Sequence, residues 1–174
     1  TVSTSGNFKI HTFTGDSNFV VSKVGNSLGG GAKVSYMVVA GGGGTPGRAA
    51  GTGIGGGAGA GGYREGRASG DTYTASPIKA PDGLTITATT FPVTVGGGGS
   101  AGAGPSGGPT NGSNGSNSIF STITSAGGGR SGRNDSSQDG QPGGSGGGST
   151  NGGTGGNGNT PPVSPSQGNG GGDG

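Results

Sequence analysis

The apolar residues of this chain alternate with polar ones over short segments, as they do in β-strands. Over residues 6–14, Phe8 and Ile10 fall on one face of an extended backbone. Residues 18–24 also have the composition of a strand, and Gly15-Asp16 between the two segments is a turn signal. The pattern therefore predicts a β-hairpin formed by these two segments.

Three further segments extend this pattern along the chain. Residues 32–40, with the sequence AKVSYMVVA, are almost entirely apolar and rich in β-branched residues, as a central strand would be. Residues 84–95 predict one or two strands, with Pro92 marking an edge, a bend or a bulge. Residues 118–126 predict the last strand. No window has a helix cap followed by apolar residues at helical spacing, so we expect five to seven short strands and an all-β fold.

Large apolar side chains are confined to the first part of the chain. The sequence contains 27 Val, Ile, Leu, Met, Phe and Tyr residues, and all except Val163 lie at or before Ile123. Residues 125–174 contain 20 glycines. Since apolar burial stabilises a core, we expect a β-rich core with inserted glycine tracts over 1–126, followed by an extended glycine-rich tail over 127–174.

The predicted core is a small β-sandwich-like unit built from 6–40, 84–95 and 118–126, with the glycine tracts leaving from one end of its strands. The side chains that we expect to be mostly buried are Phe8, Ile10, Phe19, Val34, Tyr36, Val38, Ile86, Phe91, Val93, Phe120 and Ile123.

Glycine accounts for 52 of the 174 residues, far above its average usage of about 7%. It is concentrated in three tracts, 41–62, 96–117 and 127–174. Flexible linkers and irregular ordered loops are two explanations. A third follows from the spacing: every third residue from 41 to 62 is glycine except Ala50, and a three-residue period also fits 143–160.

A left-handed helix with three residues per turn would place each column of such a sequence on its own face. Within 143–160, Gly146, Gly152 and Gly155 would then lie where backbones pack together, whereas Asn151, Thr154 and Asn157 would point outward to solvent or to a glycan. Such helices have no internal hydrogen bonds, so neighbouring segments would have to satisfy their backbone groups. We therefore predict packed helices of the polyglycine II type. Collagen is excluded because strict Gly-X-Y repeats with abundant proline are missing.

Composition and charge exclude several classes of protein. The chain has no Cys, which excludes disulfide scaffolds and thiolate metal sites. A net charge of +2 spread over nine cationic residues predicts no nucleic-acid partner, and the absence of a long apolar stretch predicts no membrane insertion. His11 is the only histidine, and the aspartates lack the spacing of a calcium loop. We therefore expect no catalytic residues, no metal, no cofactor and no enzymatic activity.

Two groups of residues remain as candidate sites. Tyr63, Arg64 and Glu65, within GGYREG, form either a polar clamp that holds a glycine tract or an exposed cluster. The residues that we consider for glycan attachment are Asn111, Asn114, Thr154, Thr160 and Ser164. The two asparagines begin N-x-S sequences, and the Pro- and Ser-containing stretch 160–166 is typical of O-glycosylated stalks or of a stiff spacer.

The order of these motifs resembles a glycine-rich domain of bacteriophage tail fibres and other virion proteins. The motifs that carry the resemblance are, in chain order, YMVVAGGGG (36–44), GAGGYREG (59–66), FPVTVGGGG (91–99), NGSNSIF (114–120) and ITSAGGG (123–129). Residues 67–83 depart from the pattern and are expected to form an added surface loop. The resemblance implies a structural or adhesive role and supplies no catalytic residue.

Two functions follow as hypotheses. The chain is either a phage fibre or virion domain that presents loops to a host-surface glycan or protein, or the repeating subunit of an extracellular, glycosylated filament. Both imply self-association, as a trimer in a fibre tip or as a helical stack in a filament, because glycine tracts expose backbone that one small chain does not satisfy. Edge residues 1–10 are candidates for pairing between subunits. The expected location is the virion or the extracellular space.

Overall fold

The computed structural model describes residues 1–26, 31–47, 55–104, 110–134 and 138–174. These residues contain ten strands and no helix, which confirms an all-β fold. The strands are β1 (Val2–Ser5), β2 (Phe8–His11), β3 (Ser17–Val20), β4 (Lys33–Val34), β5 (Tyr36–Val39), β6 (Tyr63–Gly66), β7 (Leu84–Thr85), β8 (Thr90–Thr94), β9 (Ser118–Phe120) and β10 (Ile123–Ser125).

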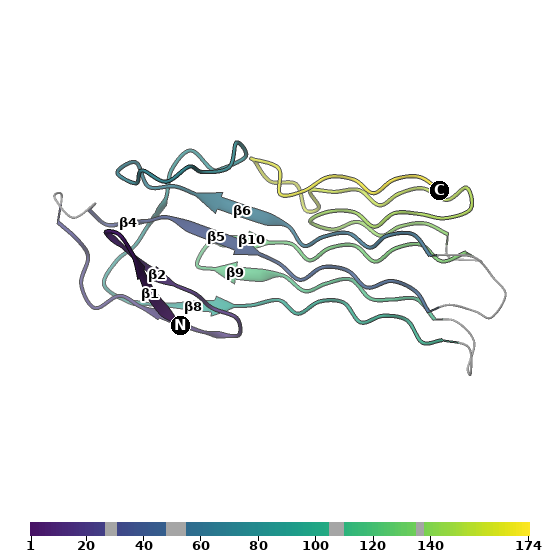
Figure 1. The fold of residues 1–174 in the computed structure, drawn as a ribbon, viewed down its shortest axis with the longest axis horizontal. Helices are drawn as coiled ribbons and strands as arrows, with labels where there is room; N and C mark the ends of the chain where they lie inside the picture. Colours follow the sequence, from purple (N-terminus) through teal and green to yellow (C-terminus); the bar gives the residue numbers. More distant parts are fainter. Residues whose placement is uncertain (27–30, 48–54, 105–109, 135–137) are drawn as a thin grey trace.

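The described strands form four small sheets with antiparallel pairing throughout. The largest has the order β10-β9-β8-β3, and the others pair β5 with β6, β4 with β7, and β1 with β2. β5 lies against β9 and β10, so the two sheets that carry the motif YMVV and the last strands contact each other. All these strands gather at one end of the molecule (Figure 1).

The predicted hairpin between 6–14 and 18–24 is wrong. β2 pairs instead with β1 through a tight turn, in which Gly6 has a φ of 55° that suits glycine. β3 pairs with β8, about 70 residues further on, and the Asp16 carboxylate accepts a hydrogen bond from the N–H of Val95 at 2.8 Å. The residues expected to turn the hairpin therefore fix β3 beside the end of β8.

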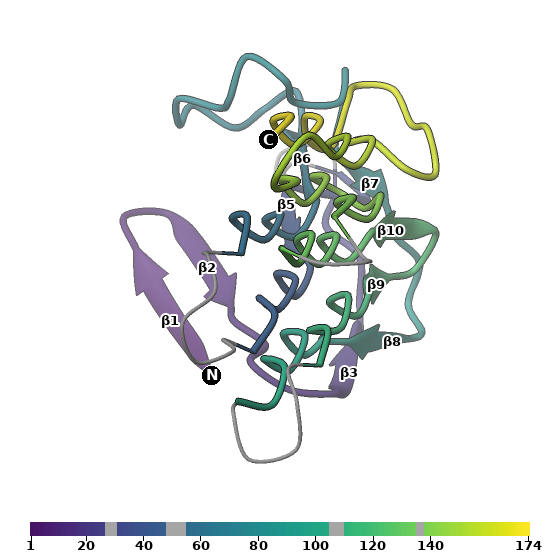
Figure 2. The same ribbon diagram turned by 90° about the vertical axis from the view of Figure 1, so that its right-hand side faces the viewer.

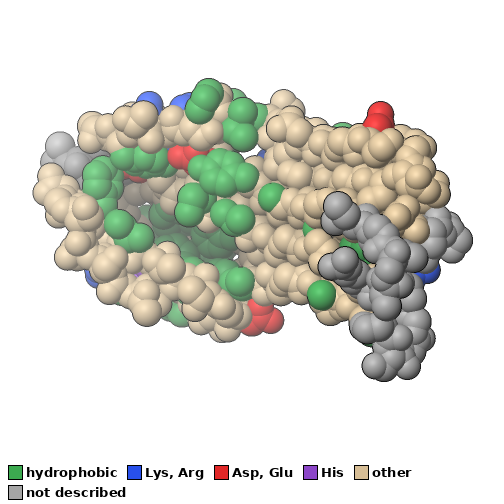
Figure 3. All heavy atoms as spheres, turned by 45° about the vertical axis from the view of Figure 1, so that its right-hand side comes forward, with side chains coloured by type: hydrophobic (Ala, Val, Ile, Leu, Met, Phe, Trp, Pro, Cys, Tyr) green, Lys and Arg blue, Asp and Glu red, His purple; other side chains and the backbone are tan. Residues whose placement is uncertain are grey.

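An aromatic cluster forms the centre of the largest sheet. Phe19 lies opposite Phe91 in the strand register, and the ring of Phe120 meets both at centroid distances of 5.9 and 6.2 Å. The His11 ring packs edge-on against Phe19 at 5.1 Å, which agrees with a structural role for the lone histidine. Figure 3 shows hydrophobic side chains gathered over this end of the molecule.

Burial in this core is only partial. Val38 and Ile86 are buried as predicted, at 8% and 7% exposure. Half-buried positions are Phe19, Val34, Tyr36, Phe91, Val93, Phe120 and Ile123. The prediction is wrong for Phe8 and Ile10, which are 38% and 44% exposed, because the β1–β2 hairpin stands away from the other sheets (Figure 2).

The glycine-rich segments leave the sheets in one direction and lie side by side as a bundle (Figures 1 and 2). We use the term glycine bundle for the segments 40–47, 55–62, 96–104, 110–117, 126–134, 138–150, 153–159 and 167–174. The exit of the tracts from one end of the strands agrees with the sequence prediction. We call the end of the bundle remote from the sheets its distal end.

Backbone hydrogen bonds join these segments at every third residue. Backbone N–H groups of segment 40–47 donate to carbonyl oxygens of 110–117. Segment 110–117 donates to 96–104 with the same three-residue spacing. The donor–acceptor pairs of the first ladder are Gly41–Ser116 (3.1 Å), Gly44–Ser113 (2.8 Å) and Gly47–Thr110 (3.0 Å). Segment 55–62 donates to 126–134 through Gly56, Gly59 and Gly62. The three-residue spacing is the one expected of helices with three residues per turn.

The glycine column that the sequence singled out lies close against neighbouring segments. A Cβ atom added to Gly41, Gly44 or Gly47 would lie 2.0, 2.1 or 1.6 Å from a backbone oxygen of 96–104. The corresponding atom of Gly59 would lie 2.2 Å from the oxygen of Ser145. Any side chain in this column would therefore separate the segments. Ala50 and Gly53 of the same column lie outside the described residues.

The tail does not form one continuous helix over 143–160. It bends at 143–145 and reverses at Asn151-Gly152, whose φ angles are 50° and 81°. The reversal lets 153–159 pair back on the preceding segment, with Gly156 donating to the oxygen of Gly147 at 2.8 Å. A Cβ on Gly152 would meet nothing within 4 Å, so its predicted packing is wrong; its φ angle is what favours glycine.

The other expectations for this segment are confirmed. A Cβ on Gly146 or Gly155 would lie 1.8 or 2.1 Å from a backbone oxygen, whereas Thr154 and Asn157 are exposed. Packed and outward positions therefore alternate within the bundle as the three-residue period predicts.

Two glycines of one segment test this arrangement. A Cβ on Gly99 would lie 2.0 Å from the oxygen of Ser113, but one on Gly97 would meet nothing within 4 Å. We expect Gly99→Ala to lower the free energy of unfolding by about 1–3 kcal/mol through overpacking. Gly97→Ala should leave it unchanged or raise it by about 0.5 kcal/mol, because alanine restricts the unfolded chain. Chemical denaturation of both variants measures the difference, and equal values would contradict the packing.

Candidate functional site

The motif GGYREG places a polar contact where the glycine bundle meets the sheets. The Tyr63 hydroxyl donates to Glu65 Oε2 at 2.7 Å, and the N–H of Ser76 donates to the same oxygen at 3.0 Å. The backbone oxygen of Glu65 accepts from the N–H of Ala80 at 2.7 Å, and Glu65 is only 7% exposed. Tyr63 and Glu65 therefore hold the loop 67–83 against β6.

Arg64 does not join this contact, because neighbouring residues of a strand point to opposite faces. On its own face it is half-buried, and its charge acts on Tyr36. Burial raises the pKa of Tyr36, and the nearby Arg64 guanidinium partly offsets that increase. Of the three predicted clamp residues, the structure thus brings together Tyr63 and Glu65, and they contact the loop 67–83.

The Tyr63 hydroxyl resists ionisation in this setting. Burial is the main cause, and the hydrogen bond to the Glu65 carboxylate together with its negative charge adds to it, raising the pKa of Tyr63 to about 12. An ionised phenol would lose its proton from the hydrogen bond and face a carboxylate. The contact therefore depends on a neutral tyrosine.

Sequence reasoning missed Gln167, which ties the tail to the sheets. Gln167 is buried, with only 2% of the residue exposed. Its Oε1 accepts from the N–H of Ala126 at 2.8 Å, and its backbone oxygen accepts from the N–H of Tyr63 at 2.9 Å. The only signal in the sequence is a glutamine alone among Pro, Ser and Gly residues, which carries little information about burial.

The positions considered for glycan attachment are spread over the bundle and its tail. Asn111, Asn114, Thr154 and Ser164 are exposed, and Thr160 is half-buried. Asn114 Oδ1 accepts from the N–H of Arg130 at 2.8 Å, and the Thr160 hydroxyl donates to the oxygen of Gly158 at 3.2 Å. The structure does not gather these residues into one site, and their modification stays a prediction.

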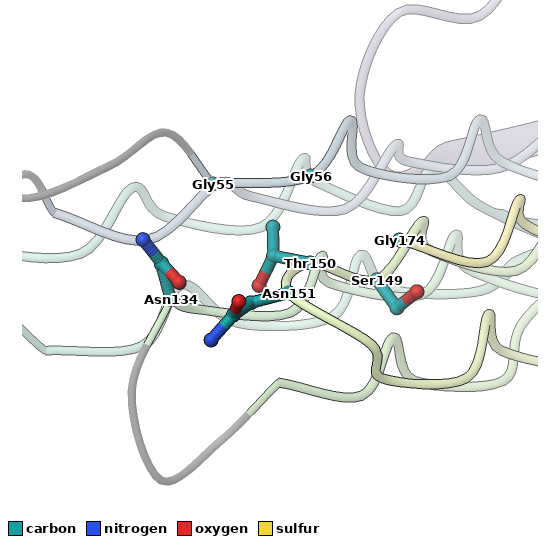
Figure 4. Close-up of a pocket in the computed structure, with 7 residues that line it drawn as sticks. All are labelled: Gly55, Gly56, Asn134, Ser149, Thr150, Asn151 and Gly174. Atoms are coloured by element: carbon teal, nitrogen blue, oxygen red, sulfur yellow. The ribbon is translucent and has the colours of Figure 1, made fainter.

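A shallow, open hollow of about 530 Å³ lies at the distal end of the bundle. Its lining residues are Gly55, Gly56, Asn134, Ser149, Thr150, Asn151 and Gly174. Figure 4 shows these residues at the ends of neighbouring segments, with the side chain of Ser149 pointing away from those of Asn134, Thr150 and Asn151. We call this feature the distal hollow.

Comparison with known proteins covers almost the whole chain. A family model described as a glycine-rich domain matches residues 12–174. The chain belongs to this glycine-rich domain family. The match includes most of the sheets as well as the bundle of this glycine-rich domain. No curated protein and no solved structure matches this chain.

The described part of the glycine-rich domain contains no group of three or more His, Cys, Asp or Glu residues placed to hold a metal ion. No helix long and apolar enough to cross a membrane occurs among the same residues.

The Tyr63 contact predicts a specific dependence on pH. Because the folded-state pKa of Tyr63, about 12, exceeds the usual tyrosine value of 10.0, this contribution to stability is complete below pH 10 and is lost as the pH rises toward 12. We expect the free energy of unfolding to fall more steeply over this range for the wild type than for Tyr63→Phe, which lacks the ionisable group. Denaturant titrations at pH 9 and pH 11 compare the two; parallel losses would refute the assignment.

Replacement of Gln167 should loosen the tail. Gln167→Ala leaves the buried N–H of Ala126 without its acceptor, so we expect a loss of about 1–3 kcal/mol and faster proteolysis of residues 160–174. Ser164→Ala, at an exposed position of the same stretch, is the control and should behave as wild type. Limited proteolysis with mass spectrometry reports the cleavage sites; unchanged cleavage in Gln167→Ala would show that this residue is not the anchor.

Proposed function

We propose that this glycine-rich domain is a non-enzymatic structural and adhesive unit of a phage tail fibre or another virion protein, which self-associates and presents its distal end to a host surface. The observation that carries the proposal is that the two ends of the fold differ. All described strands lie at one end, and the glycine bundle extends from them to a distal end, where the described chain reverses at Asn151-Gly152 (Figure 1).

The bundle suits a spacer that must hold its shape. We infer that its segments are helices of the polyglycine II type, joined through backbone groups at every third residue. Because glycine removes the side chains between segments, backbones approach closely and bond in several directions. The bundle then holds the reversal at Asn151-Gly152 in place, as a rigid scaffold holds a surface loop.

The order of motifs in the sequence also supports this function. The order of strand, glycine run, GGYREG, strand and glycine run resembles that of tail-fibre and virion proteins. Membership of the glycine-rich domain family is consistent with this resemblance but is broader than it. A host-surface glycan or protein is the partner that we propose for the distal end.

Adhesion can be measured on intact cells. We expect the fluorescently labelled domain to bind a subset of a bacterial panel, and binding to fall at least tenfold in the double variant Asn134→Gly, Asn151→Gly, which removes two side chains at the distal end. Lys9→Ser at the sheet end is the control and should bind as wild type. Binding to no strain, or equal loss in the control, would refute adhesion through the distal end.

The alternative, a repeating subunit of an extracellular filament, is favoured by the β1–β2 hairpin. Among the described strands these two pair only with each other, and Phe8 and Ile10, on one face of the hairpin, are 38% and 44% exposed. Exposed edges and apolar side chains of this kind support pairing between copies.

Self-association through this hairpin is testable in solution. Ile10→Ser should lower the association constant about tenfold by removing apolar contact, whereas Lys9→Ser, on the opposite face, should have little effect. Light scattering across a micromolar concentration series measures both. A wild type that stays monomeric throughout the series would contradict self-association.

A further inference from the structure

We propose that Asn169 is a modification site, at which the chain rearranges its own backbone through a cyclic imide formed with Gly170. The chain contains five Asn-Gly dipeptides, which begin at Asn111, Asn114, Asn151, Asn157 and Asn169. The fold restrains the first four and leaves the fifth open. The inference goes beyond the adhesive function proposed above and does not depend on it.

The reaction needs only water and the two residues themselves. Glycine has no side chain to shield its amide nitrogen from the asparagine before it. After hydroxide removes the amide proton of Gly170, the nitrogen attacks the side-chain carbonyl carbon of Asn169. A new N–C bond closes a five-membered imide, the bond from that carbon to the side-chain nitrogen breaks, and ammonia leaves with a proton from water. Water then opens the ring at either carbonyl and gives aspartate or isoaspartate.

The Asn169-Gly170 dipeptide is accessible to this chemistry. Both residues are exposed, and the Asn169 side chain makes no hydrogen bond within the described part of the chain. The Gly170 N–H likewise donates to no described residue. A Cβ atom on Gly170 would lie no closer than 3.5 Å to its nearest neighbour, so the glycine is not crowded. Segment 167–174 lies at the margin of the bundle (Figures 1 and 2).

Hydrogen bonds restrain two of the other dipeptides. The Gly115 N–H donates to the oxygen of Gly128 at 2.9 Å, and Asn114 Oδ1 accepts from the N–H of Arg130 at 2.8 Å. The Gly152 N–H also donates to a backbone oxygen, at 3.1 Å. Removing the proton from such an amide costs its hydrogen bond, so these nitrogens are poorer nucleophiles.

Packing covers the remaining two dipeptides. Gly112 is buried, and a Cβ atom there would lie 2.5 Å from the oxygen of Gly44. Gly158 is half-buried, and its Cβ atom would lie 2.1 Å from the backbone carbon of Asn169. These neighbours shield both glycines from solvent hydroxide. Among the five dipeptides, only Asn169-Gly170 combines a free side chain, an unbonded glycine N–H and an exposed glycine.

The isoaspartate product would disturb the margin of the bundle. In isoaspartate the main chain runs through the former side-chain carbonyl carbon, so it gains one carbon atom before residue 170. The next residues are bonded at fixed spacing: the Gly171 N–H donates to the oxygen of Gly156 at 2.9 Å, and the Gly172 oxygen accepts from the N–H of Ser149 at 3.0 Å. An added atom shifts this register, so we expect residues 171–174 to leave the bundle as the protein ages.

Ageing of the purified protein at pH 8.5 and 37 °C tests the site. Peptide mapping by mass spectrometry follows the mass difference between amide and acid at each dipeptide, and isoaspartyl methyltransferase labels the isoaspartate. We expect Asn169 to convert about tenfold faster than Asn114 in the same sample, because two hydrogen bonds hold the Asn114 dipeptide. Hydrogen exchange of residues 171–174 should rise in step with the isoaspartate.

Two alanine variants of one segment separate the imide route from general loosening. Gly170→Ala places its Cβ at an ordinary contact distance, so the fold is kept, and the added methyl group should slow conversion of Asn169 about tenfold. Gly172→Ala is the matched control, because its Cβ would meet nothing within 4 Å. Its conversion rate at Asn169 should equal that of the wild type.

Each other outcome overturns a stated part of the proposal. Equal conversion of all five dipeptides, or faster conversion at any of the first four, overturns the assignment to Asn169. Conversion of Gly170→Ala at the wild-type rate overturns the imide route. Isoaspartate at this position with unchanged hydrogen exchange overturns its effect on the bundle.

Discussion

Backbone hydrogen bonding between glycine-rich segments is the constraint on which this structure depends. A segment with three residues per turn has no internal hydrogen bonds, so each of its N–H and C=O groups must find a partner elsewhere. The described segments supply those partners at every third residue, as in the ladder from Gly41 to Gly47. The required approach leaves less than 2.5 Å for a Cβ atom at these positions, and only glycine fits.

The sheets and the bundle depend on each other through a few side chains at their junction. Apolar burial among the strands is incomplete, and even Phe19 and Phe91 are half-buried. Apolar burial within the sheets therefore contributes less to the free energy of folding than a fully buried core would. Gln167 and Ser125 bind backbone groups of 62–63 and 126, where strands pass into glycine segments. Ordered strands thereby fix the directions in which the segments start, and the packed segments in turn hold the strand ends together.

The sequence allowed the elements and one packing column to be predicted, because both depend on local spacing. Alternation located most of the strands but not β6, and the three-residue period identified five of the glycines that pack against backbone, namely Gly41, Gly44, Gly47, Gly56 and Gly59. Strand pairing could not be predicted from the sequence. β3 pairs with β8 about 70 residues further on, and alternation indicates an apolar face without indicating which strand lies beside it. Asn151-Gly152 shows a different failure, since this dipeptide is a turn signal that the apparent periodicity concealed. Gln167 was missed because burial of a polar residue has no local pattern.

The separation of packed and outward columns has an evolutionary consequence. Positions such as Thr154 and Asn157 project from a framework whose strength lies in main-chain groups, which mutation does not alter. Their side chains can therefore be exchanged without disturbing the registration of neighbouring segments. A lineage under pressure to alter its surface would accumulate changes in these columns rapidly, while its glycines stayed fixed. Relatives of such a domain should share a spacing of glycines long after the residues between them have ceased to correspond.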